Sequence, residues 1–140
     1  MQTTTRRTTD DLVADFMTID PIVIRPEARI EDAERLLERY DISGLPVVDE
    51  DGTLRGLISQ TDLLRGTGDV NSAIRRRFTG LRVADLMSSP AITVDLEMRL
   101  VDAARLMRDE KVHRVVAVDA RRRAVGVLSS MDFVTLYAER

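Results

Sequence analysis

Two serine–aspartate pairs and one histidine–arginine step are the residues of this chain best suited by type and spacing to hold a ligand. The pairs are Ser59 with Asp62 and Ser129 with Asp132, and the step is His113-Arg114. A carboxylate can accept hydrogen bonds from two neighbouring hydroxyl groups, and charge-assisted bonds are stronger than neutral ones. A serine at a helix start lies beside free backbone N–H groups that favour anions. Arginine offers phosphate oxygens a planar fork of donors, and histidine adds a donor whose charge depends on pH.

The same residues have a structural interpretation that needs no ligand. Ser-x-x-Asp at a helix start is close to a capping box, in which the acid reaches back to the amide of the cap residue. His113 and Arg114 would need no partner if they lay at an exposed corner between a helix and a strand. The residue types leave both interpretations open.

The chain is an internal duplication. Residues 13–64 match residues 83–134 at a constant offset of 70, with 16 identities in 52 positions. Unrelated sequences of ordinary composition would share about three. Both Ser-x-x-Asp pairs are among the identities, but a helix cap would be copied as faithfully as a binding site. The repeat therefore establishes the architecture and not the role of these residues.

Each copy is predicted to fold as a βαββα unit. Apolar residues recur with a 3.6-residue period from Ile30 to Tyr40 and from Leu100 to Met107, which predicts a helix in each copy. A final helix begins near Ser59 or Ser129. Short apolar runs predict three strands per copy, and an Asp-Gly step predicts a hairpin turn at 49–52. The predicted strands are Ile22–Ile24, Leu45–Val48, Arg55–Ile58, Ile92–Val94, Val115–Val118 and Val125–Leu128. One unit cannot bury a core alone, so we expect the two copies to pack together.

The ordered motifs resemble the CBS domain, and the whole chain resembles one stand-alone CBS-domain pair, or Bateman module. The motifs are Val13–Met17 ahead of a proline, Ile42–Asp49 and Gly56–Asp62, with the second-copy counterparts Val83–Met87, Val112–Asp119 and Gly126–Asp132. The resemblance implies an α/β fold of two tandem βαββα repeats with pseudo-twofold symmetry and two clefts, commonly assembled into a disc-like dimer. The expected division is an N-terminal polar segment (1–12), repeat 1 (13–64), a linker (65–82), repeat 2 (83–134) and a C-terminal tail (135–140).

The resemblance also implies a ligand and its contacts. Family members bind AMP, ADP, ATP, S-adenosylmethionine or related ligands, and usually regulate an attached or partner protein. By analogy Asp62 and Asp132 would hold the ribose, with Ser59 and Ser129 beside them, while His113-Arg114 would contact a phosphate. An adenine slot is expected near the first extended segments. Its candidate residues are Ile22, Val23, Ile92, Thr93, Ile58 and Leu128.

The two copies differ where the phosphate contacts are expected. The second copy has Lys111, His113 and Arg114 where the first has Asp41, Ser43 and Gly44. We therefore expect one cleft to bind a phosphorylated adenosine ligand, and the other to be weak, empty or tuned to a less anionic one.

Composition excludes several other functions. The net charge of −3 argues against a nucleic-acid partner, and no apolar run approaches the roughly 20 residues that span a bilayer. With no cysteine, one histidine and no H-E-x-x-H, G-x-S-x-G or P-loop pattern, neither a metal site nor an enzyme is indicated. The polar N-terminus carries no signal-peptide core, so the cytoplasm is the expected location.

These features together predict a non-catalytic regulatory sensor of an adenosine-type ligand. We expect a homodimer formed through the helical faces, no required cofactor, and signalling to an unidentified effector protein. The alternative is a ligand-free dimerisation or scaffold module with the same fold. In the linker, a helical turn within Val70–Phe78 and a solvated face at Arg75–Arg77 are also expected.

Overall fold

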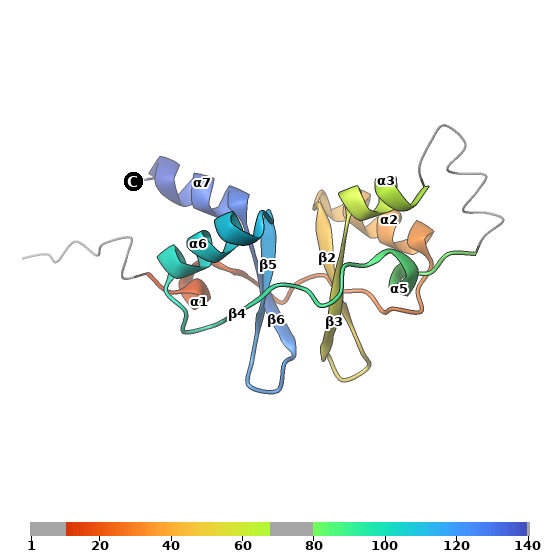
Figure 1. Ribbon diagram of the computed structural model, residues 1–140, viewed down its shortest axis with the longest axis horizontal. Coiled ribbons are helices and arrows are strands. Elements are labelled where there is room, and N and C mark those ends of the chain that lie inside the picture. The colour runs from red at the N-terminus through yellow and green to blue at the C-terminus, as the bar shows by residue number, and fades with distance from the viewer. Residues whose placement is uncertain (1–10, 68–79, 140) are drawn as a thin grey trace, which may run out of the picture.

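The computed structural model describes residues 11–67 and 80–139, so the features expected within 70–78 lie outside the described residues. It consists of two α/β halves whose hairpins meet in the middle and whose helices lie on the outside (Figure 1). The elements in chain order are α1 (Val13–Phe16), β1 (Thr18–Ile19), α2 (Ile30–Tyr40), β2 (Gly44–Val48), β3 (Leu54–Ser59), α3 (Gln60–Thr67), α5 (Val83–Leu86), β4 (Thr93–Asp95), α6 (Leu100–Glu110), β5 (Arg114–Val118), β6 (Ala124–Ser129) and α7 (Ser130–Glu139).

The long helix of each half forms where the apolar period predicts it. α2 has the predicted bounds, and α6 runs three residues past the predicted end. α2 buries Ile30, Ala33 and Leu37, which lie three and four residues apart on one face. Both helices end on a residue in the left-handed region, Asp41 (φ 52°) in α2 and Lys111 (φ 57°) in α6.

The hairpin of each half pairs in the same register. β2 pairs antiparallel with β3, and β5 pairs antiparallel with β6. Residues 45–48 and 115–118 are buried at every position, because one face packs on helices and the other on the opposite half. The predicted first strand differs between the halves. The second half has β4, which pairs parallel with β5, whereas the first half has a single bridge from Ile24 to Val47.

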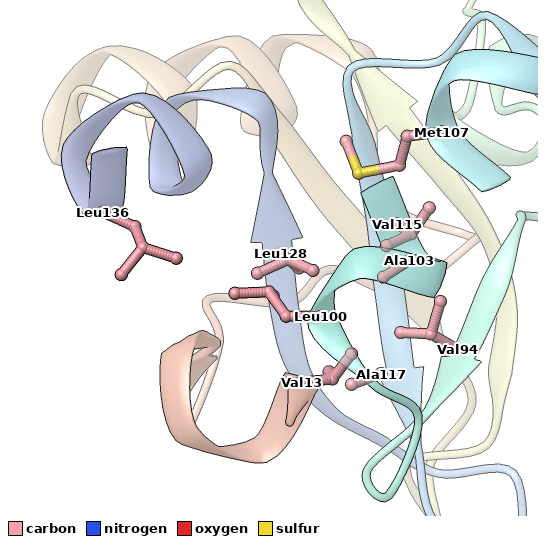
Figure 2. Packing of buried hydrophobic residues seen from close by; sticks show 9 residues of the cluster. All are labelled: Val13, Val94, Leu100, Ala103, Met107, Val115, Ala117, Leu128 and Leu136. Carbon is pink, nitrogen blue, oxygen red and sulfur yellow. The ribbon is translucent and has the colours of Figure 1, made fainter. Parts of the chain in front are cut away.

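The two halves exchange the segments with which their repeats begin, so that each segment packs in the core of the other half. Val13 of α1 is fully buried in the core of the second half, beside Leu100 and Ala117 (Figure 2). β1 continues the exchange by pairing with β6, which gives a sheet of order β1-β6-β5-β4. In return Val83 of α5 is buried in the core of the first half. Neither residues 13–64 nor residues 83–134 therefore contain all the residues of one core.

The two halves meet through a third apolar cluster and through their hairpin turns. Val48 and Leu54 of the first half pack against Val116 and Val118 of the second. The Leu54 N–H donates to the Arg122 carbonyl at 2.9 Å, and the Ala124 N–H donates to the Gly52 carbonyl at 3.1 Å. The two bonds are symmetry counterparts, because Ala124 and Arg122 stand 70 positions after Leu54 and Gly52.

Gly56 and Gly126 lie where the exchanged segments cross the hairpins. A Cβ at Gly56 would lie 2.7 Å from the Ser88 carbonyl oxygen and 2.9 Å from Met87 Sδ. The Ser88 backbone cannot retreat, because it exchanges two hydrogen bonds with Leu57 at 3.0 and 2.8 Å. Glycine is needed here because the backbone of the other segment approaches closely.

We predict that Gly56→Ala destabilises the fold by about 1–3 kcal/mol, the usual cost of forcing an extra methyl group into a packed site. Urea unfolding followed by circular dichroism measures the loss. The matched variant is Gly126→Ala, whose Cβ would mainly meet the flexible Met17 side chain. It should cost less, and an equal or larger loss at Gly126 would contradict this explanation.

Candidate functional site

A groove of about 520 Å³ lies between the halves at the start of α7, and we call it the Asp132 groove. The second half contributes Ser129, Asp132 and Arg114. The first half contributes the segment from Thr18 to Ile22, apart from Ile19, and residues 41–44 at the end of α2 and the start of β2. The exchange of N-terminal segments forms this groove, because β1 places Thr18 beside β6.

Asp132 both caps its helix and lines the groove. Its Oδ2 accepts hydrogen bonds from the Ser129 backbone N–H at 2.7 Å and from Ser129 Oγ at 3.2 Å. Among the described residues none donates to its Oδ1, and the side chain is half-buried. The capping and ligand-binding interpretations are therefore compatible here, because the cap uses one oxygen of the carboxylate and leaves the other available to hydroxyl donors.

Asp62, the counterpart of Asp132, is buried, and protein groups donate hydrogen bonds to both of its carboxylate oxygens. Its Oδ2 accepts from the Ser59 N–H at 2.9 Å and from Ser59 Oγ at 3.0 Å, and its Oδ1 accepts from Ser88 Oγ at 3.3 Å. Asp62 and Ser59 are only 9% and 8% exposed. Both oxygens of this carboxylate already have partners, so the two repeated pairs are not equivalent.

Arg114 crosses from the second half to the first. One of its Nη atoms donates to Ser43 Oγ, and its stem lies over Gly44, where a Cβ would be 2.6 Å from Arg114 Cδ. Burial lowers the pKa of Arg114, and the Asp62 carboxylate acts in the opposite direction. Gly44 is also the counterpart of Arg114 in the repeat. Because a side chain at position 44 would collide with Arg114, only one of positions 44 and 114 can carry a long side chain.

His113 and Arg114 do not act at one place. Successive residues entering a strand point to opposite faces, and His113 lines a different groove of about 410 Å³ between α6 and α7. Its backbone carbonyl accepts from the Ser130 N–H at 2.8 Å, which ties α7 to the end of α6. We call this second hollow the helix groove. The expected corner that joins His113 with Arg114 is thus divided between two grooves.

The candidates for the adenine slot are also separated. Ile22 lines the Asp132 groove, whereas Val23 is outside its lining and 38% exposed. Ile58 and Leu128 are fully buried in the two cores, so the structure places them inside the protein and not in a cleft wall. Ile92 and Thr93 belong to the second half, where Ile92 packs against the core and Thr93 is in β4.

Ser43 and Thr18 are groove residues that the sequence analysis did not single out. Ser43 follows the end of α2, and Thr18 reaches the groove only because β1 pairs with the other half. The Gly44–Arg114 difference between the copies was a signal for the contact of Arg114 with Ser43. The exchange of segments left no comparable signal in either copy.

Neither a cluster of metal-ligating side chains nor a membrane-spanning helix occurs in the part of the sequence that the structure describes. Residues 11–67 and 80–139 contain no group of three or more His, Asp or Glu side chains that could hold a metal ion. In the same residues, every helix is too short or too polar to cross a bilayer.

With the fold and the groove described, the chain can be assigned to a class. The CBS domain family matches residues 13–68 and 83–139, and the protein belongs to that family as a tandem CBS pair. Among solved structures it is similar to the CBS-pair protein CBSX2 of Arabidopsis thaliana in complex with AMP. The two are 34% identical with a TM-score of 0.79, over 93% of this chain and 99% of that chain.

Two further proteins show the range of its relatives. The CBS domain pair of protein MJ0100, solved with 5′-methylthioadenosine and S-adenosyl-L-methionine, is 27% identical with a TM-score of 0.77, over 91% of this chain and 96% of that one. Inosine-5′-monophosphate dehydrogenase of Mycobacterium tuberculosis is 34% identical over 119 residues, which are 84% of this chain. The chain spans 21% of the length of that enzyme and 61% of the length of chloroplastic CBSX2.

We predict that Asp62→Ala destabilises the fold more than Asp132→Ala. Removing Asp62 leaves the buried donors of Ser59 without an acceptor, at about 1–3 kcal/mol, and also removes the bond from Ser88 Oγ. Removing Asp132 costs about 1 kcal/mol for the cap alone. Urea unfolding of both variants tests the difference, and equal losses would mean that the two aspartates have the same structural role.

Proposed function

We propose that this chain is a non-catalytic regulatory sensor that binds an adenosine-type ligand in the Asp132 groove. The observation that carries the proposal is the meeting of three groups in one cavity: the Asp132 carboxylate, the N-terminus of α7 and the Arg114 guanidinium. A volume of about 520 Å³ suits a small molecule, since such sites usually measure roughly 300–1,000 Å³.

Each group has a part in this proposal. Asp132 Oδ1 accepts hydrogen bonds from the ribose hydroxyls while Oδ2 keeps the cap. The first backbone N–H groups of α7 and the Arg114 guanidinium face the phosphate, because both favour anions. Ile22 supplies an apolar contact for the base. Of the candidates from sequence analysis, Ser129, Asp132, Arg114 and Ile22 are retained in one groove, whereas Ser59, Asp62 and His113 lie outside it.

The relatives support the ligand class, and the charge of the groove narrows it. CBSX2 has been solved with AMP, and the MJ0100 pair with S-adenosylmethionine and methylthioadenosine. Arg114 favours a phosphorylated member of this class, because the sulfonium cation of S-adenosylmethionine would lie near a guanidinium. We therefore propose AMP, ADP or ATP as the ligand, with one strong site in each chain.

Regulation would operate through a partner. We propose a homodimer in the cytoplasm whose ligand favours one arrangement of the halves, and an effector protein that responds to that arrangement. A ligand can shift such an equilibrium only by its differential affinity for the two states. Arg114 is a suitable element, because it contacts Ser43 of the other half and lines the groove.

A ligand-free scaffold is the second candidate function. The observation that favours it is that both aspartates cap their own helices, so their retention in the sequence needs no ligand. The same fold and the same dimer would then have a purely structural purpose.

We predict that AMP binds to the wild-type chain and that Asp132→Asn weakens it about tenfold or more, since a hydrogen bond to a charged group contributes about 1.5–3 kcal/mol. Arg114→Ala should weaken AMP strongly and adenosine little, because adenosine lacks the phosphate. Isothermal titration calorimetry with both ligands measures these differences.

Asp62→Asn is the matched control, because it changes the repeated aspartate whose oxygens are already occupied. It should leave the affinity for AMP nearly unchanged. If Asp62→Asn and Asp132→Asn weaken AMP equally, the assignment of the groove is wrong. If neither AMP, ADP, ATP, S-adenosylmethionine nor NADH binds at millimolar concentration, the scaffold is the better description.

A further inference from the structure

The Asp132 groove contains more acidic than basic side chains. Its ionisable lining residues are Asp20, Asp41, Asp132 and Arg114. Three carboxylates and one guanidinium leave the lining with a formal charge of −2. Asp132 already has a part in holding the ribose, whereas Asp20 and Asp41 have none in holding an anion. These two carboxylates oppose an anionic ligand, so they bear on which nucleotide the groove accepts.

The groups that favour an anion lie together in the groove. Arg114 pairs with Ser129 across the hairpin of the second half, so the arginine starts beside the N-terminus of α7. Its guanidinium reaches Ser43 of the first half. The lining therefore offers one full positive charge and the start of one helix, which together suit a single phosphate group.

The two further carboxylates lie on the segments of the first half that line the groove. Asp41 is two residues before Ser43, on the segment that Arg114 contacts. Asp20 directly follows β1. Both side chains are exposed, and among the described residues no arginine or lysine forms an ion pair with either. Both charges therefore act on whatever occupies the groove.

Backbone conformation explains why these two side chains are short and polar, but it does not explain their charge. Asp20 and Asp41 are both in the left-handed region, with φ of 49° and 52°. Asparagine also enters this region readily and carries no charge. Lys111, the counterpart of Asp41 in the repeat, holds the same conformation at φ 57°. The fold therefore does not require an acid at these positions.

Nucleotides differ in how much negative charge they bring to this groove. A terminal phosphate carries about −1.5 to −2 at neutral pH, and each added phosphate group of ADP and ATP increases the total. AMP can place its one phosphate between the Arg114 guanidinium and the start of α7. A second and a third phosphate find no further cation in the lining, and they enter the field of Asp20 and Asp41. Like charges brought together in a binding site are strongly unfavourable.

We propose that Asp20 and Asp41 make the Asp132 groove selective for a nucleoside monophosphate, because they repel the longer phosphate chains of ADP and ATP. The inference rests on the proposed function, and it narrows the three nucleotides named there to AMP. The same two carboxylates should have little effect on adenosine, which carries no phosphate.

Isothermal titration calorimetry in EDTA and at low ionic strength compares the nucleotides at their full charge. The wild-type chain should bind AMP at least about tenfold more tightly than ATP, because of the like charges. Asp20→Asn/Asp41→Asn should strengthen ATP by about the same factor and leave adenosine unchanged. Since asparagine accepts the left-handed backbone at both positions, circular dichroism should show an unchanged fold.

Glu50→Gln/Glu97→Gln is the matched control, because it removes the same net charge at exposed positions outside the groove lining. It should keep the wild-type ratio of the two affinities. Salt gives a second readout that needs no variant. Raising the ionic strength should narrow the difference between AMP and ATP in the wild-type chain, because salt screens exposed charges.

The possible failures of the selection and of the ligand site are distinguishable. Equal wild-type affinities for AMP and ATP would overturn the selection and leave the site in place. A ratio that Asp20→Asn/Asp41→Asn does not change would show that these charges are not its cause. Tighter binding of S-adenosylmethionine than of AMP would show that the acids select a cation. If neither adenosine nor any nucleotide binds, the site itself is absent and the selection fails with it.

Discussion

The structure depends on the exchange of N-terminal segments between the two halves. Val13 and Val83 are fully buried, and each fills the core of the half to which the repeat would not assign it. The exchange is held by backbone bonds as well, such as Leu100 N–H to the Asp11 carbonyl at 2.7 Å. A single repeat would lose both a core residue and an edge segment of its sheet, so the pair folds as one unit.

The Asp132 groove is a direct consequence of this exchange. β1 brings Thr18 and the residues after it to the start of α7, where Ser129 and Asp132 already form a cap. The same crossing in the other half brings Ser88 to Asp62, but there the Ser88 hydroxyl bonds to the carboxylate at 3.3 Å. The pseudo-twofold symmetry therefore places an exchanged segment beside each aspartate. The two places differ chemically because only Asp62 accepts a hydrogen bond from that segment.

Sequence reasoning predicted the parts of the fold that follow from local pattern. The apolar period gave both long helices, and continuous apolar runs gave both hairpins, because these signals act over a few residues. The four-residue helices α1 and α5 were missed, since their stability comes from Val13 and Val83 packing in a distant core. The grouping of the candidate residues was predicted in part. Asp132, Arg114 and Ile22 meet in one groove, but Ile58 and Leu128 are core residues and His113 faces another groove. Strand alternation could have separated His113 from Arg114, whereas the sealing of Asp62 depends on a residue 26 positions away.

In a duplicated chain, the positions at which the two copies carry different residue types are the best candidates for function. Positions that bury the core have kept their character, because both halves need them. Gly44 and Arg114 differ because only one long side chain fits where the halves meet. The charges at the ends of α2 and α6 differ although the helices themselves are alike. The first of these differences places the Arg114 guanidinium in the lining of the Asp132 groove. Arg114 belongs to none of the apolar clusters, so it can be altered without removing a core residue, and a loss of ligand binding can be separated from a loss of folding.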